Sequence, residues 1–324
     1  MTPTELAGET PAPPLARRAV IDVGTNSVKL LVAEVAGRTV QPVYEQSLQT
    51  RLGRGFYAAH VLQASAIAST AEAVAGFVTQ ARERRSASIR VLATSAARDA
   101  SNADQLVAAV ERAAGVRLEI VSGEQEAHWA FAGVASDPRL AGRPLLIMDA
   151  GGGSTQLIYG PDAGEPARHS FRIGAVRLLE RFPPSNPPLP EELGRCRDWL
   201  RRYFREHTPK TLAPGWAGDP GKTPCFVGTG GASSLLAAMQ LGLAEFDREK
   251  LESVELTAGQ VKDRLEDLWG LSLDERKRLP GLPENKADVI LMGVAIHEAV
   301  MTGFAVPSMR VSTRGFRFAA LMEA

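Results

Sequence analysis

Apolar residues recur along this chain at two different spacings, and the alternation of these spacings predicts an α/β fold. Short apolar runs bounded by tight turns predict strands in the first part of the chain, at residues 19–23, 28–35, 40–49, 89–93 and 117–121. Apolar residues three and four positions apart predict helices among them, at residues 61–84, 102–114 and 123–135. Three strands therefore come first, and helices and strands then alternate.

A second series begins after residue 144 and resembles the first. It predicts strands at 145–148, 156–159, 167–173, 226–228 and 309–312. It predicts helices at 175–182, 191–207, 232–239, 258–268, 287–301 and 316–322, while 183–190 and 209–224 are rich in Pro or Gly and are interpreted as inserted loops. One pattern occurs in both series, as Asp22-x-Gly24-Thr25-x-Ser27 and as Asp149-x-Gly151-Gly152-x-Ser154. Such a repeat indicates internal duplication.

Length and repeat together predict two domains. At 324 residues and 34.6 kDa the chain exceeds the usual size of one hydrophobic core. We expect a flexible tail at 1–17, a first domain at 18–135 and a second at 136–324, with the last helix as a candidate to pack back on the first domain.

Composition narrows the class of protein. Hydrophobic residues are 44% and charged residues 23%, which is typical of a globular protein, and 37 basic residues balance 37 acidic ones. We therefore expect neither nucleic acid nor a membrane as partner. Two cysteines, Cys196 and Cys225, indicate a reducing compartment. No export signal and no apolar stretch of about 18 residues is present, so we expect a cytoplasmic protein.

The two Asp-Gly turns have the chemistry of phosphate sites. Successive backbone N–H groups in a turn of small residues form a concavity that binds anions. A carboxylate repels phosphate but holds hydrated Mg²⁺, so Asp22 and Asp149 are candidate metal positions. A single turn of this kind is equally compatible with a hairpin whose Asp only caps backbone amides. Its occurrence at equivalent places in a repeat favours the phosphate interpretation.

The two turns resemble the paired phosphate loops of the actin, sugar kinase and heat-shock ATPase superfamily. Four segments resemble the exopolyphosphatase and guanosine pentaphosphate phosphohydrolase (Ppx/GppA) family, at 19–27, 93–100, 120–127 and 147–155. The likeness continues at 228–231, 279–282, 287–290 and 311–312, so it covers about 300 residues in order. The chain resembles the short members that lack an additional helical domain.

The resemblance implies a fold and an activity. It implies two ribonuclease-H-like (actin-like ATPase) domains with an interdomain cleft, and a homodimer. It implies hydrolysis that releases terminal phosphate from polyphosphate or guanosine pentaphosphate (pppGpp), with Mg²⁺, or Mn²⁺, as cofactor. Water would attack in line with the bond that breaks.

The family motifs also imply roles for individual residues. In Ser-Gly-x-x-Glu-Ala the Glu, here Glu126, is the base that activates water, and Arg98 is a basic contact to phosphate. The expected phosphate-binding residues are Gly24, Thr25, Asn26, Ser27, Lys29, Arg98, Gly151, Gly152, Gly153, Ser154, Thr155, Gly228, Gly230 and Gly231. The expected metal positions are Asp149, Asp22 and Gln156. Lys29 is as well explained as an ordinary strand-surface lysine.

The chain departs from the family pattern in three places. Gln156 and Gln125 stand where relatives commonly have Glu, and Arg317-Phe-Ala319 stands for Arg-Glu-Gly. An amide offers a metal its carbonyl oxygen but no charge, so we expect that Gln156 weakens metal binding or that water carries this contact. Arg197, Arg201 and Arg205 form a helical stripe that either guides a polyanion or, as we favour, is a salt-bridged surface.

Three other functions compete with this hypothesis. Gly228-x-Gly230 after a strand, with Asp247 further on, resembles a dinucleotide motif, but the third glycine is missing. A small-molecule kinase of the same superfold would need ATP and an acceptor. A non-catalytic sensor of polyphosphate or guanosine alarmones would bind without forming product, with Gln156 as its lesion.

Overall fold

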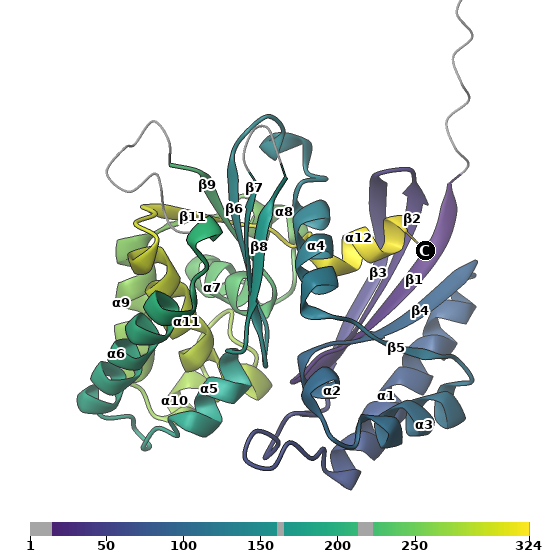
Figure 1. The fold of residues 1–324 in the computed structure, drawn as a ribbon, viewed down its shortest axis with the longest axis horizontal. Coiled ribbons are helices and arrows are strands. Elements are labelled where there is room, and N and C mark those ends of the chain that lie inside the picture. The colour runs from purple at the N-terminus through teal and green to yellow at the C-terminus, as the bar shows by residue number, and fades with distance from the viewer. Residues whose placement is uncertain (1–14, 161–164, 213–222, 324) are drawn as a thin grey trace, which may run out of the picture.

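The computed structural model describes residues 15–160, 165–212 and 223–323. These residues form two α/β domains side by side, each built on one sheet (Figure 1). Strand order is β3-β2-β1-β4-β5 in the first sheet and β10-β11-β9-β6-β7-β8 in the second. Read from the other edge, β8-β7-β6-β9-β11 repeats the order of the first sheet, so the predicted duplication and the predicted fold class are confirmed.

The first domain has two helical layers. Its strands are β1 Ala16–Val23, β2 Ser27–Ala36, β3 Thr39–Gln49, β4 Ser88–Ala93 and β5 Leu118–Ile120. Its helices are α1 Ala64–Glu83, α2 Ser95–Asp99, α3 Ala103–Ala114 and α4 Gly123–Val134. Successive residues of β1 point to opposite faces, so Ile21 packs with α1 and α3 while Val20 packs with α4.

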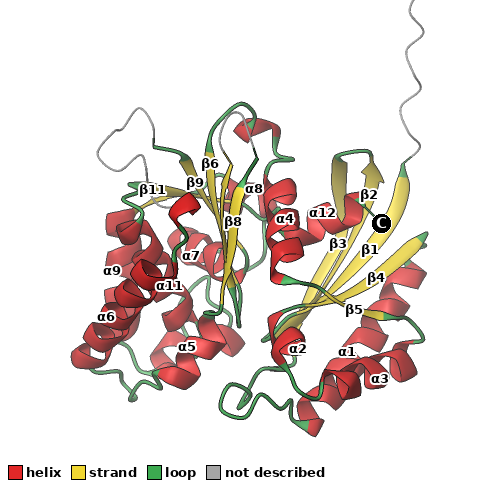
Figure 2. Ribbon diagram, viewed as in Figure 1, coloured by secondary structure: helices red, strands yellow, loops and turns green. Residues whose placement is uncertain are grey.

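The second domain carries most of its helices on one side of its sheet (Figure 2). Its strands are β6 Leu145–Ala150, β7 Thr155–Gly160, β8 Ala167–Phe171, β9 Cys225–Thr229, β10 Glu255–Thr257 and β11 Ser308–Val311. Its helices are α5 Ala175–Arg181, α6 Pro190–His207, α7 Gly231–Leu241, α8 Arg248–Glu252, α9 Ala258–Trp269, α10 Leu273–Arg276 and α11 Ile290–Gly303. Helix α4 contacts β6, β7 and β8 as well, so it lies between the two sheets.

The last helix, α12 (Phe316–Met322), lies on the first domain. Arg18 of β1 donates a hydrogen bond to the carbonyl of Leu321 (2.9 Å), and α12 packs closely against α4. A Cβ at Gly133 of α4 would collide with the carbonyl of Gly315, which precedes α12. The chain therefore crosses back to its first domain at its end.

Several predicted boundaries were wrong. The predicted tail 1–17 is too long, because Ala16 pairs with Val35 in the sheet; residues 1–14 lie outside the described residues. The helix predicted at 61–84 begins at Ala64, because the side chain of Asn102 hydrogen-bonds both the N–H and the carbonyl of Leu62 and keeps that segment extended. Most of the predicted loop 209–224 lies outside the described residues, which lack 213–222.

Four short elements escaped prediction, namely α2, α8, α10 and β10, because three to five residues are too few to show a period. The helix predicted at 287–301 begins at Ile290, since residues 284–286 form a 3₁₀ turn that ends at Ala287. No helix within the described residues is both long and apolar enough to span a membrane.

Substituting Gly133→Ala tests the close packing of α4 on the segment before α12. The added methyl group has no room, so we expect a loss of about 1–3 kcal/mol in the free energy of unfolding measured in urea. The control is Gly194→Ala in α6, where a Cβ meets nothing within 4 Å. The free energy of unfolding of Gly194→Ala should rise by up to about 1 kcal/mol, because alanine has a higher helix propensity than glycine. Equal gains in both variants would contradict the packing.

Candidate functional site

The two Asp-Gly turns adopt matching backbone conformations. Each joins a central strand to its antiparallel neighbour, β1 to β2 and β6 to β7. The N–H of Gly24 donates to the carbonyl of Ser27 at 3.0 Å, and the N–H of Gly151 donates to the carbonyl of Ser154 at 2.9 Å. Small residues permit these tight turns, and both turns face the boundary between the domains.

A cavity of about 440 Å³ lies between the domains, with both turns in its wall. Most of the predicted site residues line it: Asp22, Gly24, Thr25, Asn26, Ser27, Lys29, Glu126, Asp149, Gly151, Gly152, Gly153, Ser154, Gly230 and Gly231. Another part of the wall is apolar and belongs to the second domain, where Leu235, Ile290 and the exposed Phe246 line it. The cavity thus combines an end formed by the glycine turns and charged side chains with an apolar side.

Four predicted site residues do not line this cavity, namely Arg98, Thr155, Gln156 and Gly228. The hydroxyl of Thr155 donates to the carbonyl of Ile173 at 2.7 Å. The amide of Gln156 is 1% exposed and donates to the hydroxyls of Ser154 and Ser170, both at 3.0 Å. Gln156 therefore shapes the second turn from behind, and this position does not support its expected role as a metal ligand.

Glu126 lies in the first turn of α4, which begins after Ser122, whose hydroxyl accepts from the N–H of Gln125 at 3.1 Å. The residue is 7% exposed. Arg98 donates to its Oε2 at 3.1 Å and to the carbonyl of Val121 at 2.8 Å. The guanidinium expected to contact phosphate thus positions the carboxylate in this structure.

Burial raises the pKa of Glu126 to about 8. The charge of Arg98 opposes the rise, and the nearby charge of Asp149 adds to it. A carboxyl group with this pKa exchanges a proton near neutral pH, which suits a general base.

Asp22 and Asp149 are two further acidic residues of the cavity, close enough for their charges to interact. Burial raises the pKa of Asp149 to about 6, with the charge of Asp22 adding to the rise, and burial also raises the pKa of Asp22. The Oδ1 atom of Asp22 is buried and accepts no hydrogen bond. Buried acceptors usually have a partner, so this oxygen has capacity for a cation.

The donor set limits which metal fits. Within the part of the chain that the structure describes, no three His, Cys, Asp or Glu side chains cluster tightly enough to hold a metal. Two aspartates that leave the remaining positions to water suit Mg²⁺, which binds through one or two carboxylates and keeps several waters.

Two cationic residues of the cavity were not among the predicted site residues. Lys286 donates to the hydroxyl of Ser27 at 2.5 Å, and burial, with the charge of Lys29 adding to it, lowers the pKa of Lys286 to about 8. Arg317, in the first turn of α12, also lines the cavity. No local pattern marks Lys286, and the motif that contains Arg317 gave that residue no role, because each reaches the cavity only through tertiary packing.

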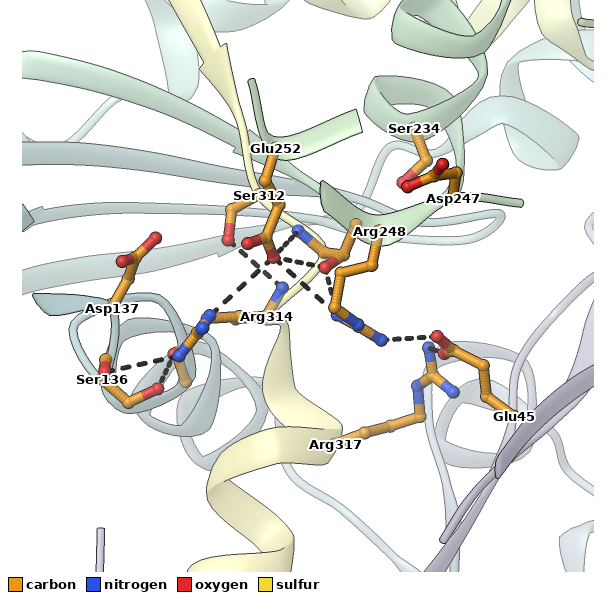
Figure 3. A network of polar contacts seen from close by, with 12 residues as sticks. Glu45, Ser136, Asp137, Ser234, Asp247, Arg248, Glu252, Ser312, Arg314 and Arg317 are labelled. Carbon is orange, nitrogen blue, oxygen red and sulfur yellow. Dashed lines mark hydrogen bonds and ion pairs between the residues drawn. The ribbon is translucent and has the colours of Figure 1, made fainter. Parts of the chain in front are cut away.

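A network of ion pairs lies beside the cavity, and two of its residues, Glu45 and Arg317, line the cavity (Figure 3). Glu45 of β3 pairs with Arg248 of α8 and lies 3.6 Å from Arg317. Glu252 accepts from Arg139 at 2.5 Å and lies 3.8 Å from both Arg248 and Arg314. Through the ion pair of Glu45 with Arg248, the network joins β3, an edge strand of the first domain, to α8 of the second domain.

The arginine stripe of α6 is at least partly a salt-bridged surface. Arg197 pairs with Glu298 at 2.5 Å and with Glu266 at 3.0 Å, and Arg201 pairs with Asp198 at 3.1 Å. These two guanidinium groups are thus engaged within the protein.

The duplicated sheets and the two turns that face one cavity define a two-domain actin-like ATPase fold. The model of the Ppx/GppA phosphatase family matches residues 31–323. The chain belongs to the Ppx/GppA phosphatase family.

Three known proteins illustrate the similarity. Exopolyphosphatase 2 from Mycobacterium tuberculosis is 30% identical over 296 residues, covering 88% of this chain and 89% of that protein. The guanosine-5'-triphosphate,3'-diphosphate pyrophosphatase of Pseudoalteromonas translucida is 27% identical and covers 92% of this chain and 57% of that protein. The crystal structure of the Aquifex aeolicus family member has a TM-score of 0.77 and 28% identity, covering 96% of this chain and 97% of that one.

The raised pKa of Glu126 predicts how stability depends on pH. Its carboxyl binds a proton more tightly in the folded state, so its contribution to stability is complete below pH 4.5 and is lost as the pH rises to about 8. Relative to Glu126→Gln, the free energy of unfolding of the wild type should fall by up to about 1.4 kcal/mol per pH unit in this window.

The measurement is urea unfolding at several pH values in the presence of a chelator. The exposed neighbour Glu124 provides the matched control, because Glu124→Gln should follow the wild type. Parallel pH curves for Glu126→Gln and the wild type would show that the pKa of Glu126 is not raised.

Proposed function

We propose that the protein is a hydrolase of phosphoanhydride bonds, which releases terminal orthophosphate from inorganic polyphosphate or guanosine pentaphosphate. The observation that carries the proposal is the convergence of both glycine turns and buried Glu126 on one cavity. The names of two relatives, an exopolyphosphatase and a guanosine pyrophosphatase, support it. They do not favour a sensor or a kinase.

The reaction follows from the residues of the cavity. The turns bind the terminal phosphates through backbone N–H groups, and Lys29 and Lys286 neutralise part of their charge. Glu126 orients a water molecule and takes its proton as the oxygen attacks the terminal phosphorus. The bond to the bridging oxygen breaks, and the shortened chain leaves with that oxygen.

Mg²⁺ is the proposed cofactor, and Mn²⁺ is an alternative. Asp22 and Asp149 would hold the ion, as the unpaired Oδ1 of Asp22 supports. When bound, the ion offsets the negative charge of the phosphoryl group that is transferred. A homodimeric assembly and a cytoplasmic location stay predictions from the family resemblance and the sequence.

The first test is phosphate release by the purified protein with Mg²⁺ on polyphosphates of several lengths, guanosine pentaphosphate and ATP in parallel. Glu126→Gln should lower kcat roughly a hundredfold or more with little change in KM, because general-base help has about that size. Removal of the metal with EDTA should abolish release, and added Mg²⁺ should restore it.

Glu124→Gln serves as the control and should keep wild-type kcat. Full activity of the Glu126 variant would refute the assignment of the base. Binding of these compounds by the wild type without release of phosphate would instead indicate a sensor.

A further inference from the structure

The carbonyl groups of the second glycine turn, residues 151–153, are all held from behind. The N–H of Ala175 donates to the first carbonyl at 3.0 Å, and the N–H groups of Val176 and Arg177 donate to the second at 2.8 and 3.1 Å. The third carbonyl accepts from a side chain, Nε of Arg177, at 3.0 Å. In a trans peptide the following N–H points opposite to the carbonyl, so these bonds turn the N–H groups of the turn toward the cavity.

The first turn is supported differently. There the carbonyl of Thr25 accepts from the N–H of Gly53 at 2.7 Å, and the carbonyl of Asn26 accepts from the N–H of Arg51 at 3.0 Å. Both donors are backbone groups of the same domain. In the second turn, by contrast, the last carbonyl depends on the guanidinium of Arg177, which has freedom to move unless something else holds it.

The first domain holds that guanidinium. Nη2 of Arg177 pairs with Asp99 at the end of α2 at 2.5 Å, and the guanidinium lies over the ring of Tyr57 at 4.1 Å from its centroid. Glu180, which lies on α5 together with Arg177, accepts hydrogen bonds from the N–H groups of Gly55 and Tyr57 at 2.5 and 3.1 Å. Helix α5 of the second domain is thus bound by the first, and in Figure 1 α5 and α2 lie on opposite sides of the boundary, at the same end of it.

The turn itself also touches the first domain. A Cβ at Gly153 would collide with the hydroxyl of Tyr57 and would lie 2.6 Å from the hydroxyls of Ser95 and Thr25. All three neighbours belong to the first domain. The second turn therefore contacts the first domain at Gly153, and Arg177 bonds both to Gly153 and to the first domain.

We propose that Arg177 is a positioning residue, which links docking of the first domain to the shape of the second phosphate turn. The inference rests on the proposed phosphohydrolase function. When Asp99 and Tyr57 hold the guanidinium, Nε holds the carbonyl of Gly153, and the next N–H points into the cavity. Without them the turn loses this support, and stabilisation of the transferred phosphoryl group falls.

The test compares Arg177→Gln, Asp99→Asn and the double variant on whichever substrate the wild type hydrolyses. Each single substitution should lower kcat by about tenfold to a hundredfold, because a small misplacement at a site has that cost. The double variant should be no worse than Arg177→Gln alone, since both act through one link. Arg177→Lys should recover only part of the loss, because lysine keeps the charge for Asp99 but has no Nε–H for Gly153.

Arg172→Gln is the matched control. Arg172 also pairs with Asp99, at 3.1 Å, but its side chain is 68% exposed. It should keep kcat within about twofold of the wild type. Thermal unfolding of every variant separates positioning from folding, since a purely structural role predicts activity losses that follow Tm.

Wild-type kcat in Arg177→Gln, or losses that multiply in the double variant, would overturn the inference while leaving the proposed function intact. If Arg177→Gln does not fold, Asp99→Asn decides, with wild-type kcat in that variant counting against the link. A wild type that releases no phosphate from any of the substrates would refute the proposed function itself.

Discussion

A glycine turn binds an anion only if its carbonyl oxygens are held away from that anion, because an oxygen turned inward would repel it. The rest of this site depends on that constraint. The turn after β1 meets it with backbone donors from its own domain, at Arg51 and Gly53. The turn after β6 meets it with the start of α5 and the side chain of Arg177, which the first domain contacts. Only the docked domains therefore complete both turns.

The same cavity gathers opposite charges at some cost in stability. Glu126 and Asp22 are buried and Asp149 is partly buried, and the pKa values of all three rise because water is largely excluded from them. Lys286 is partly buried, and its pKa falls. The charged form of each group would be more stable in water. Binding of a cation beside the carboxylates and of an anion beside the lysine would therefore stabilise these charged forms. Strained electrostatics of this kind are typical of functional sites.

Helix α4 lies at the centre of the architecture, since it contacts the second sheet and α12 and shares a hydrophobic cluster with the first sheet. Its first turn carries Glu126, and its later turns contact the segment that returns to the first domain at Gly315. The ion pair of Glu45 with Arg248 and that of Asp99 with Arg177 connect the domains through different elements. The carboxylate is thus placed by rigid elements of both domains, which is what precise positioning of water requires.

The sequence by itself determined the two strand-turn-strand units and the repeat, because apolar runs and Asp-Gly spacings are local features of the chain. The family motif around Glu126 also predicted that residue as the general base. Only the tertiary structure decided that Lys286 and Arg317 reach the cavity and that Arg98 holds Glu126. These contacts join segments that are separated in the chain, and they form only when the tertiary structure brings those segments together, so no local pattern encodes them.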